Sequence, residues 1–356
     1  DHLLETLTDV ALGSPAVLAA RMLDVPGLSP QVRRELAART AYSFWRLFNR
    51  PASIRLIRQL DSTGSDSSDE DAYWHRVLRY CRDGNLQAVL DETWHLVFEQ
   101  HGWAAGQEIN SVCRDCVTDV VEMVEPRPSR VLARCYRVKG NQVETEELHL
   151  RMMFALRLGH LQSEEGGLTQ DAVRKAFNSP FRPFLLSSTS VGQEGLDFHP
   201  WCHRIVHWNL PGNPVDMEQR EGRVHRYKGH AVRKNVAARF SSKSLCNWRP
   251  GHNLWQEIFE RADREARAQG RSELVPYWVA PGEARIERHV PALPYTSEVE
   301  AFARLKRQLA AYRVVFGQPR QEELLDLLDS SQVSQGQLEA WSIDLMPTES
   351  ELPKVS

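Results

Sequence analysis

The first third of the chain has the apolar spacing of amphipathic helices. Apolar residues recur three and four positions apart in Ala11–Leu23 and Gln31–Phe48, with breaks at Pro26-Gly27 and Ser29-Pro30. Three later segments repeat this spacing, namely Tyr73–Cys81, Leu86–Gln100 and Glu108–Met123. The pattern therefore predicts an all-α domain over residues 1–125.

Two segments inside this domain permit more than one interpretation. The helix predicted at Gln31–Phe48 contains four aromatic residues, which could form core or a platform for stacking bases; we expect core. They are Tyr42, Phe44, Trp45 and Phe48. Asp61–Asp71 has no apolar residue and no positive charge, so it predicts an exposed, mobile linker.

Strands and helices alternate over residues 126–245. Val131–Val138 and Leu148–Leu156 show the apolar alternation of strands. Thr169–Phe177 has helical spacing, and Thr169 is a plausible cap for that helix. Such alternation predicts an α/β domain whose strands form a parallel sheet with flanking helices.

Two short apolar runs follow, Phe184–Leu186 and Arg204–Trp208, and each predicts a buried strand. The loop between them is polar, and its Gly192 and Gly195 have wide backbone freedom. Strand, polar loop and strand together indicate the edge of a nucleotide-binding sheet, where ligands meet the carboxyl ends of strands.

A helix is predicted directly after the second run. Asn213 can cap it, and Pro214 suits its first turn, where a missing N–H costs nothing. The predicted helix extends through Arg226, so Arg223 and Arg226, three positions apart, share one face. Glu221 is expected to orient a nearby arginine, as is Glu194 in the preceding loop.

Helical spacing returns in the C-terminal third of the chain, at His252–Gln269, Val299–Phe316 and Gln321–Leu328. Prolines punctuate Pro276–Pro294 between them. We expect a C-terminal helical brace over residues 246–340, followed by a flexible tail at residues 341–356.

Two motifs in the middle of the chain carry a family resemblance. The segment Gln219–Arg226, QREGRVHR, resembles motif VI of superfamily 2 helicases, Q-x-x-G-R-x-x-R. Ser188-Thr189 and Gly192–Asp197, about twenty residues earlier, resemble motif V. The residues of these two motifs are most similar to those of the Swi/Snf-like branch and of large bacterial helicases of phage-defence operons such as DISARM. The resemblance implies the second RecA-like lobe of a helicase or translocase.

The resemblance also implies roles in ATP binding and hydrolysis. Arg223 and Arg226 match the arginines that reach the γ-phosphate of ATP, where a guanidinium pairs with phosphate and stabilises growing charge. Gly195 and Asp197 match positions that approach the nucleotide. Gln219 matches the leading glutamine, a polar contact at the lobe interface.

Further implications concern the nucleic acid. Ser188, Thr189 and Ser190 stand where motif V contacts a phosphate backbone. Double-stranded DNA is favoured over RNA as the track, because the Swi/Snf-like branch translocates on duplex DNA. Backbone tracking predicts no sequence specificity. Other subunits of a defence system are further possible partners.

An ATPase of this class also needs a G-x-x-x-x-G-K-[ST] loop and an acidic pair for Mg²⁺. The chain has no such loop, and Asp91-Glu92-Thr93 lies inside a run with helical spacing. The chain begins with Asp1 rather than Met. We therefore expect the C-terminal part of a longer protein, whose first RecA-like lobe would hold most of the ATP and Mg²⁺. The helical domain over residues 1–125 would then link the two lobes.

An alternative is a non-catalytic nucleic-acid-binding or assembly subunit that works with a separately encoded ATPase lobe.

The amino-acid composition says little about the class of protein. The chain has 356 residues, a net charge of −3 and six cysteines, which suggests a globular protein with reduced thiols. Arg220–Arg239 holds seven Lys or Arg against one acidic residue, a local excess that suits phosphates.

No metal site is predicted. Cys113-x-x-Cys116 lacks a second pair at zinc spacing, and His199, His203 and His207 straddle a loop and a strand. No apolar run approaches the length of a membrane span, so we expect a cytoplasmic protein without a membrane partner.

Overall fold

The computed structural model describes residues 2–62, 72–102, 108–125, 129–140, 142–152, 170–187, 197–246, 251–291, 295–315, 321–331 and 333–342. The chain divides into two compact units. Unit 1 comprises Asp1–Leu196 and Ser242–Ile258, and unit 2 comprises Asp197–Ser241 and Phe259–Ser356.

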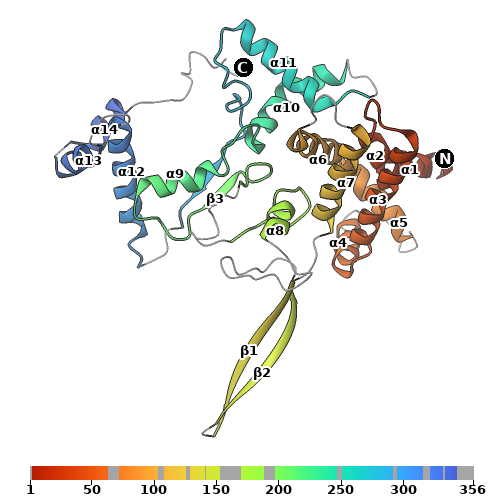
Figure 1. The fold of residues 1–356 in the computed structure, drawn as a ribbon, viewed down its shortest axis with the longest axis horizontal. Helices are drawn as coiled ribbons and strands as arrows, with labels where there is room; N and C mark the ends of the chain where they lie inside the picture. Colours follow the sequence, from red (N-terminus) through yellow and green to blue (C-terminus); the bar gives the residue numbers. More distant parts are fainter. Residues whose placement is uncertain are drawn as a thin grey trace. The chain divides into compact units, whose positions relative to one another are not determined.

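Seven helices open unit 1, and they are coloured red to yellow in Figure 1. Their bounds are α1 His2–Gly13, α2 Pro15–Met22, α3 Pro30–Phe48, α4 Pro51–Ser62, α5 Tyr73–Asp83, α6 Leu86–His101 and α7 Ile109–Val124. The predicted helices correspond to α2, α3, α5, α6 and α7, whereas α1 and α4 were not separately predicted. Most of the segment Asp61–Asp71 lies outside the described residues.

Short polar signals set where these helices begin and end. The Ser29 hydroxyl accepts a hydrogen bond from the Val32 N–H at 3.3 Å, and Pro30 occupies the first turn of α3. Asn85 caps α6 from a left-handed backbone conformation, with φ 48°. Gly102 ends α6 with φ 56°, which is the usual place for a left-handed glycine.

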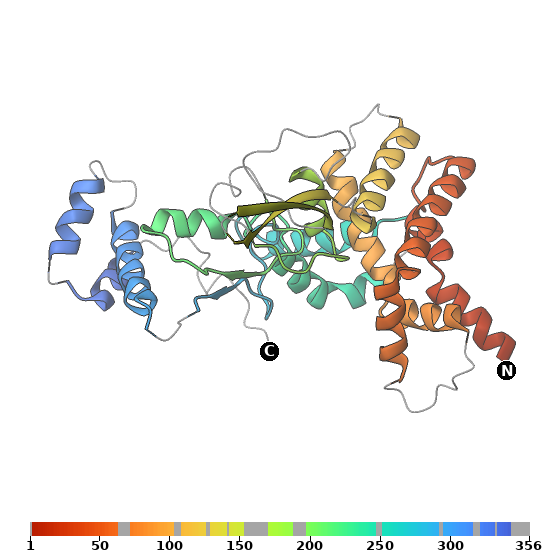
Figure 2. The same ribbon diagram turned by 90° about the horizontal axis from the view of Figure 1, so that it is seen from below.

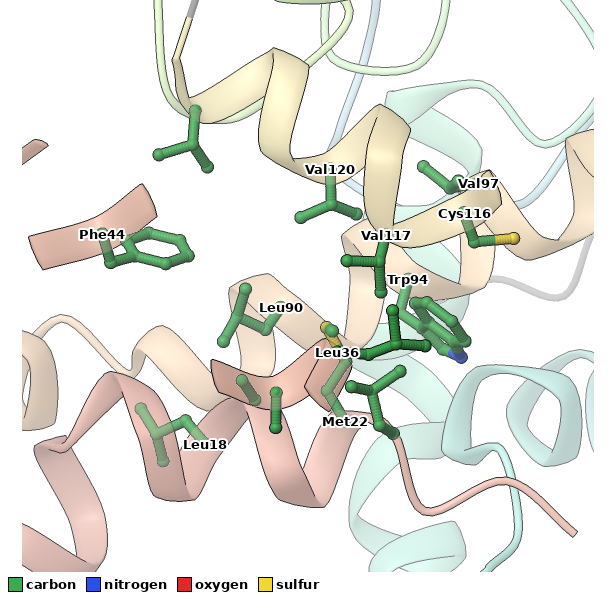
Figure 3. Close-up of a cluster of buried hydrophobic side chains, with 14 of the residues drawn as sticks. Leu18, Met22, Leu36, Phe44, Leu90, Trp94, Val97, Cys116, Val117 and Val120 are labelled. Atoms are coloured by element: carbon green, nitrogen blue, oxygen red, sulfur yellow. The ribbon is translucent and has the colours of Figure 1, made fainter. Parts of the chain in front are cut away.

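The main hydrophobic core lies among α2, α3, α6 and α7 (Figure 3). Leu18, Leu36, Leu90, Val117 and Val120 are almost fully buried there. Each fully buried aliphatic side chain contributes roughly 1.5–3 kcal/mol to folding. Apolar burial at helical spacing is therefore what holds the helices of unit 1 together.

The four aromatic residues of α3 divide between core and surface. Phe44 and Phe48 are buried in this core, as predicted. Tyr42 and Trp45 are 59% and 58% exposed, so the expectation that they belong to the core is wrong. Helix geometry is the reason, because the buried pair and the exposed pair project from different sides of α3.

The two strands predicted after residue 126 form an antiparallel hairpin rather than part of a parallel sheet. β1, Ser129–Lys139, pairs with β2, Gln142–Met152, in the register Arg134↔Glu147 (Figure 1). A short turn at Gly140 joins them, and so tight a connection permits only antiparallel pairing. Cross-strand ion pairs accompany the backbone ladder, at Arg134–Glu147, Arg137–Glu146 and Lys139–Glu144.

Helix α8, Gln170–Phe177, confirms the helix predicted there and packs on α7. The Lys175 ammonium donates to Asp119 at 2.9 Å and to Glu122 at 3.1 Å. The strand predicted at Phe184–Leu186 is wrong, because that segment has no strand pairing and Phe184 is 84% exposed. A short apolar run shows hydrophobicity but not a partner, and a strand needs a partner.

Unit 2 begins with a small parallel sheet. β3, Arg204–Val206, pairs with β4, Glu287–His289, and these two strands are the whole parallel sheet in the part of the chain that the structure describes. Helix α9, Pro214–Gly222, follows β3. The helices α10, His230–Leu245, and α11, Leu254–Ala268, lie between the two strands in sequence.

Three further helices follow in unit 2, namely α12 Glu298–Val314, α13 Gln321–Ser330 and α14 Gln335–Trp341. They lie together in Figures 1 and 2, where they are drawn in blue. Leu305 and Leu309 of α12 pack against Met217 of α9, and Leu338 of α14 packs against Ala310 and Ala311. The tail predicted at residues 341–356 lies outside the described residues, except for the end of α14.

Within the described residues, no single helix has the length and apolar character needed to cross a membrane. The segments Leu3–Gly13 and Pro15–Met22 meet that criterion only as a pair, with a bend of 45° between them.

Candidate functional site

The two motifs differ in how much of them the structure describes. Ser188, Thr189, Ser190 and Gly195 lie outside the described residues. Asp197, Gln219, Arg223 and Arg226 are described, and all four belong to unit 2. The geometry of the site therefore rests on the end of motif V and on motif VI.

Helix α9 carries the first part of motif VI. The Asn213 side chain accepts a hydrogen bond from the Asp216 N–H at 2.8 Å, and Pro214 opens the helix, as predicted. The helix ends at Gly222, and Arg223 is its C-cap. Arg226 lies beyond the helix, so the prediction that both arginines share one helix face is wrong. Gly222 helps end the helix, because glycine is among the weakest helix formers.

A turn replaces the predicted last helical turn and brings Arg226 to Asp197. The Arg226 Nε and the Asp197 Oδ1 are 3.2 Å apart, and each side chain is 47% exposed. Such an exposed ion pair contributes at most about 1 kcal/mol to stability. Its main effect is to orient the guanidinium, which remains accessible to an anionic ligand.

Arg223 is tied to the same loop through its backbone. Its carbonyl oxygen accepts a hydrogen bond from the Phe198 N–H at 2.9 Å, and its side chain is half-buried. Gln219, one turn earlier in α9, is exposed. The start of the loop after motif V therefore runs beside both arginines of motif VI, although about 26 positions of chain separate them in sequence.

The turn after Arg226 is held in place by Lys228. Its backbone has φ 48°, and its N–H donates to the Tyr277 carbonyl at 2.7 Å. The Lys228 ammonium lies 4.6 Å from the ring centroid of Phe259 and also faces the rings of Tyr227 and Tyr277. Cation–π attraction of this kind is worth ~2 kcal/mol or more when the cation is desolvated.

Arg233 in α10 holds the turn through hydrogen bonds to backbone carbonyl groups. Its side chain is fully buried, and it donates to the carbonyl of Lys228 at 2.8 Å and to that of Pro200. Its guanidinium carbon lies 5.4 Å from the centroid of the Trp201 ring. Burying a cation is costly unless its donors are satisfied, so these carbonyls offset part of that cost.

These two contacts alter the interpretation of the basic segment Arg220–Arg239. We expected its cations to face phosphates, but Lys228 and Arg233 are buried and support the turn that carries Arg226. Sequence reasoning missed this role, because a lysine or arginine in a polar stretch usually lies at the surface. The aromatic residue Tyr227 beside Lys228 was the one feature of the local sequence that could have indicated a buried lysine packed on aromatic rings.

Glu221 orients an arginine, as predicted, but the partner is Arg288 of β4. Arg288 makes a two-pronged salt bridge to the Glu221 carboxylate, and the His207 Nε2 lies 3.1 Å from the same group. Burial opposes ionisation of Glu221, yet these hydrogen bonds and the Arg288 charge hold its pKa below the usual value. Sequence reasoning missed Arg288, whose strand was not predicted.

The loop after Asp197 contains His199, whose carbonyl oxygen accepts a hydrogen bond from the His230 N–H at 2.9 Å. Burial lowers the pKa of His199 to about 4, and the charges of Arg233 and Arg226 act in the same direction. Burial and Arg233 likewise lower the pKa of His230 to about 4. The rings of His203 and His230 lie 5.0 Å apart. Both low-pKa histidines are therefore neutral near pH 7.

The described residues contain no group of three or more His, Cys, Asp or Glu side chains that could hold a metal ion. Cys113 and Cys116 are fully buried in α7. Burial raises the pKa of the Cys113 thiol to about 11 and that of Cys116 to about 12. Metal binding requires thiolates, so this environment favours two protonated core thiols.

Comparison with known proteins supports the class that the motifs indicate. Residues 115–228 match the family model described as the helicase conserved C-terminal domain. This match supports a helicase C-terminal lobe in the chain, and such domains have a RecA-like fold. They generally bind nucleic acid and act with ATP and Mg²⁺.

The matched range ends at Lys228 and includes Asp197, Gln219, Arg223 and Arg226. Comparisons with curated proteins and with solved structures gave no match.

Proposed function

We propose that this chain is the C-terminal portion of an ATP-dependent DNA helicase or translocase of the Swi/Snf-like branch of superfamily 2. The observation that carries the proposal is the pairing of Asp197 with Arg226 inside a region that matches a helicase C-terminal domain. That region holds candidate residues of both motif V and motif VI.

In this proposal, Arg223 and Arg226 stabilise the γ-phosphate of ATP; Arg223 is partly exposed, and the Arg226 side chain is 47% exposed. The Asp197 carboxylate orients Arg226 until the γ-phosphate takes the place of the carboxylate. A phosphate group with two negative charges is a stronger partner for a guanidinium than a carboxylate with one. An arginine in this role contributes roughly 10³–10⁵ to turnover in related phosphoryl-transfer systems. Gly195, Asp197 and Gln219 would contact the rest of the nucleotide or the facing lobe.

The nucleic-acid track would be contacted by Ser188, Thr189 and Ser190. Double-stranded DNA is the proposed track, with contacts to phosphates rather than to bases. The longer protein would act in the cytoplasm, in a bacterial phage-defence system of the DISARM kind, with other defence subunits as partners.

A first RecA-like lobe of the same polypeptide would hold most of the ATP and Mg²⁺. The proposed domains are a helical linker domain at residues 1–125, the RecA-like lobe at 126–245 and a helical brace at 246–340.

The alternative is a non-catalytic assembly or nucleic-acid-binding subunit that works with a separately encoded ATPase lobe. The reading frame directly upstream distinguishes the two, because a Walker-type loop there supports the first and a stop codon supports the second.

The decisive measurement is ATP hydrolysis by the 356-residue chain and by the longer parent protein, each with and without duplex DNA. We expect no turnover from the chain and DNA-stimulated turnover from the parent. Turnover by the chain alone would contradict the proposal, since it would require a complete phosphate-binding site in these residues.

Arg226→Ala in the parent should lower turnover by roughly 10³-fold or more and leave DNA affinity nearly unchanged. Arg267→Ala is a matched control, because Arg267 is an exposed arginine of unit 2 that pairs with Asp263 at 2.8 Å. The control should keep its turnover. Equal loss of turnover and DNA affinity in Arg226→Ala would exclude the phosphate-binding role.

A further inference from the structure

The outer face of α3 exposes a stacked pair of aromatic side chains. The ring centroids of Tyr42 and Trp45 are 5.5 Å apart, and the ring planes differ by 14°. Both side chains are more than half exposed, although Tyr and Trp each carry a large apolar surface. The surrounding backbone of α3 is regular, so helix geometry alone presents the pair to solvent.

The same side of α3 carries the exposed cation Arg34 and, seven positions before Tyr42, the exposed carboxylate Glu35. Arg34, Ala38 and Tyr42 follow one another at four-residue spacing, so they form a row along the helix, and all three are exposed. Ala38, between Arg34 and Tyr42 in this row, has only a methyl side chain. Trp45 extends this row by one turn.

The segment that contains this row is rich in arginine, although Arg33 pairs with Asp24 at 2.8 Å and Arg46 with Glu125 at 2.7 Å. Residues 30–60 contain seven arginines and one acidic residue, Glu35, in a chain whose net charge is −3. Glu35 is itself held by Arg114, whose two terminal nitrogens lie 2.7 and 3.1 Å from its oxygens. Helix α4 continues the basic segment with Arg55 and Arg58, which are both exposed.

We propose that this face of α3, formed by Arg34, Ala38, Tyr42 and Trp45, binds single-stranded nucleic acid. A base would stack on the aromatic pair, and Arg34 would contact a neighbouring phosphate. Stacking on aromatic side chains contributes roughly 1–3 kcal/mol per base and tolerates any base. Because bases in a duplex already stack on each other, the aromatic pair selects single strands.

A protein partner is the other occupant to consider. Tyr, Trp and Arg are also enriched in protein interfaces, so residue type alone does not separate the two partners; the argument for a nucleic acid is the excess of arginines in the segment that carries the aromatic pair. Electrostatic complementarity therefore favours a partner with regularly spaced negative charges beside planar rings, which describes a nucleic acid strand.

The test is fluorescence anisotropy of a labelled oligonucleotide of about 20 nucleotides, longer than the ~4–16 nucleotides of comparable single-strand sites. The 356-residue chain is titrated against the single strand and against the matching duplex. Trp45→Ala and Tyr42→Ala should each weaken single-strand binding by roughly 5- to 150-fold, which corresponds to the loss of one stacked base. Trp45→Phe and Tyr42→Phe should keep most of the affinity.

Two further variants separate stacking from charge. Arg34→Ala should lower the slope of log affinity against log salt by about 0.7, the effect of one phosphate contact to a single strand. Trp45→Ala should leave that slope unchanged. Trp341→Ala is the matched control, because Trp341 is an exposed tryptophan of α14 and should not affect binding.

Three outcomes would overturn the proposal. These are no single-strand binding by the chain, unchanged affinity in both alanine variants, or equal losses for single strand and duplex. Binding of polyglutamate that competes fully with the oligonucleotide and is equally weakened by Trp45→Ala would point instead to an acidic protein partner. The inference does not rest on the proposed ATP chemistry, and ATP hydrolysis by the parent protein tests that separately.

Discussion

At the scale of single residues, the site depends on charged side chains whose roles differ with their burial. Arg226 is half-exposed and accessible to an anion, whereas Arg233, seven positions later, is fully buried and supports the backbone. The motif identified Arg226 from its type and spacing. Nothing in the local sequence could identify Arg233, because its burial depends on Pro200 and Trp201 far away in the chain.

Gly13 at the end of α1 should not tolerate a side chain. An added Cβ would lie 2.1 Å from the Leu78 carbonyl oxygen of α5, which is backbone and cannot move aside cheaply. Gly13→Ala should therefore destabilise the protein by about 2 kcal/mol or more in denaturant unfolding, although alanine is the better helix former.

The matched control is Gly336→Ala in α14, where the added Cβ would meet nothing within 4 Å. This change should be neutral or stabilise the protein by up to ~1 kcal/mol. Equal effects of the two changes would mean that α1 and α5 do not approach as closely as described.

At the scale of elements, helices were predicted well and strand partners were not. The periodicity of α3, α6 and α11 is contained within each segment, so the sequence shows it directly. β1 and β2 were predicted as strands, but their antiparallel pairing depends on the short turn at Gly140. Helix α14 was missed, although Ser334 and Gln337 have the spacing of a capping box.

That capping box should control the local stability of α14. The Ser334 hydroxyl accepts a hydrogen bond from the Gln337 N–H at 3.3 Å, and the Gln337 side chain accepts one from the Ser334 N–H at 2.9 Å. Ser334→Ala should cost about 1 kcal/mol, which is roughly a fivefold loss of amide protection in α14 by hydrogen exchange.

Ser342→Ala provides a control at the other end of α14. The Ser342 hydroxyl donates to the Glu339 carbonyl at 2.8 Å, a contact that should matter less than the cap. An effect of Ser342→Ala as large as that of Ser334→Ala would argue against the capping box as the controlling feature.

At the scale of the whole molecule, two partly buried histidines make the stability of the protein depend on pH. His199 and His230 have pKa values of about 4 in the folded protein, against about 6.5 when unfolded. The unfolded chain therefore binds more protons between pH 6.5 and 4. Stability should be fully present above pH 6.5 and should fall as the pH drops through that window.

Denaturant unfolding measured at a series of pH values tests this expectation. Replacing both histidines, His199→Asn and His230→Asn, should flatten the dependence between pH 6.5 and 4. His252→Asn, at an exposed histidine, should not flatten it. A loss of stability confined to pH values below 4 would contradict the role of the two histidines and would point to Glu221 and Glu287, whose pKa values are lowered.

The sequence by itself determined the features that are encoded locally. These are the helices with apolar spacing, the Asn213-Pro214 helix start and the two motifs that predicted a helicase C-terminal lobe. Only the tertiary structure decided which of these residues meet, because contacts join positions far apart in the chain. The pairing of Asp197 with Arg226, the burial of Arg233 and the exposure of Trp45 are all outcomes of packing. Local propensity can specify a helix, but a neighbour in space is specified only when the whole core has formed.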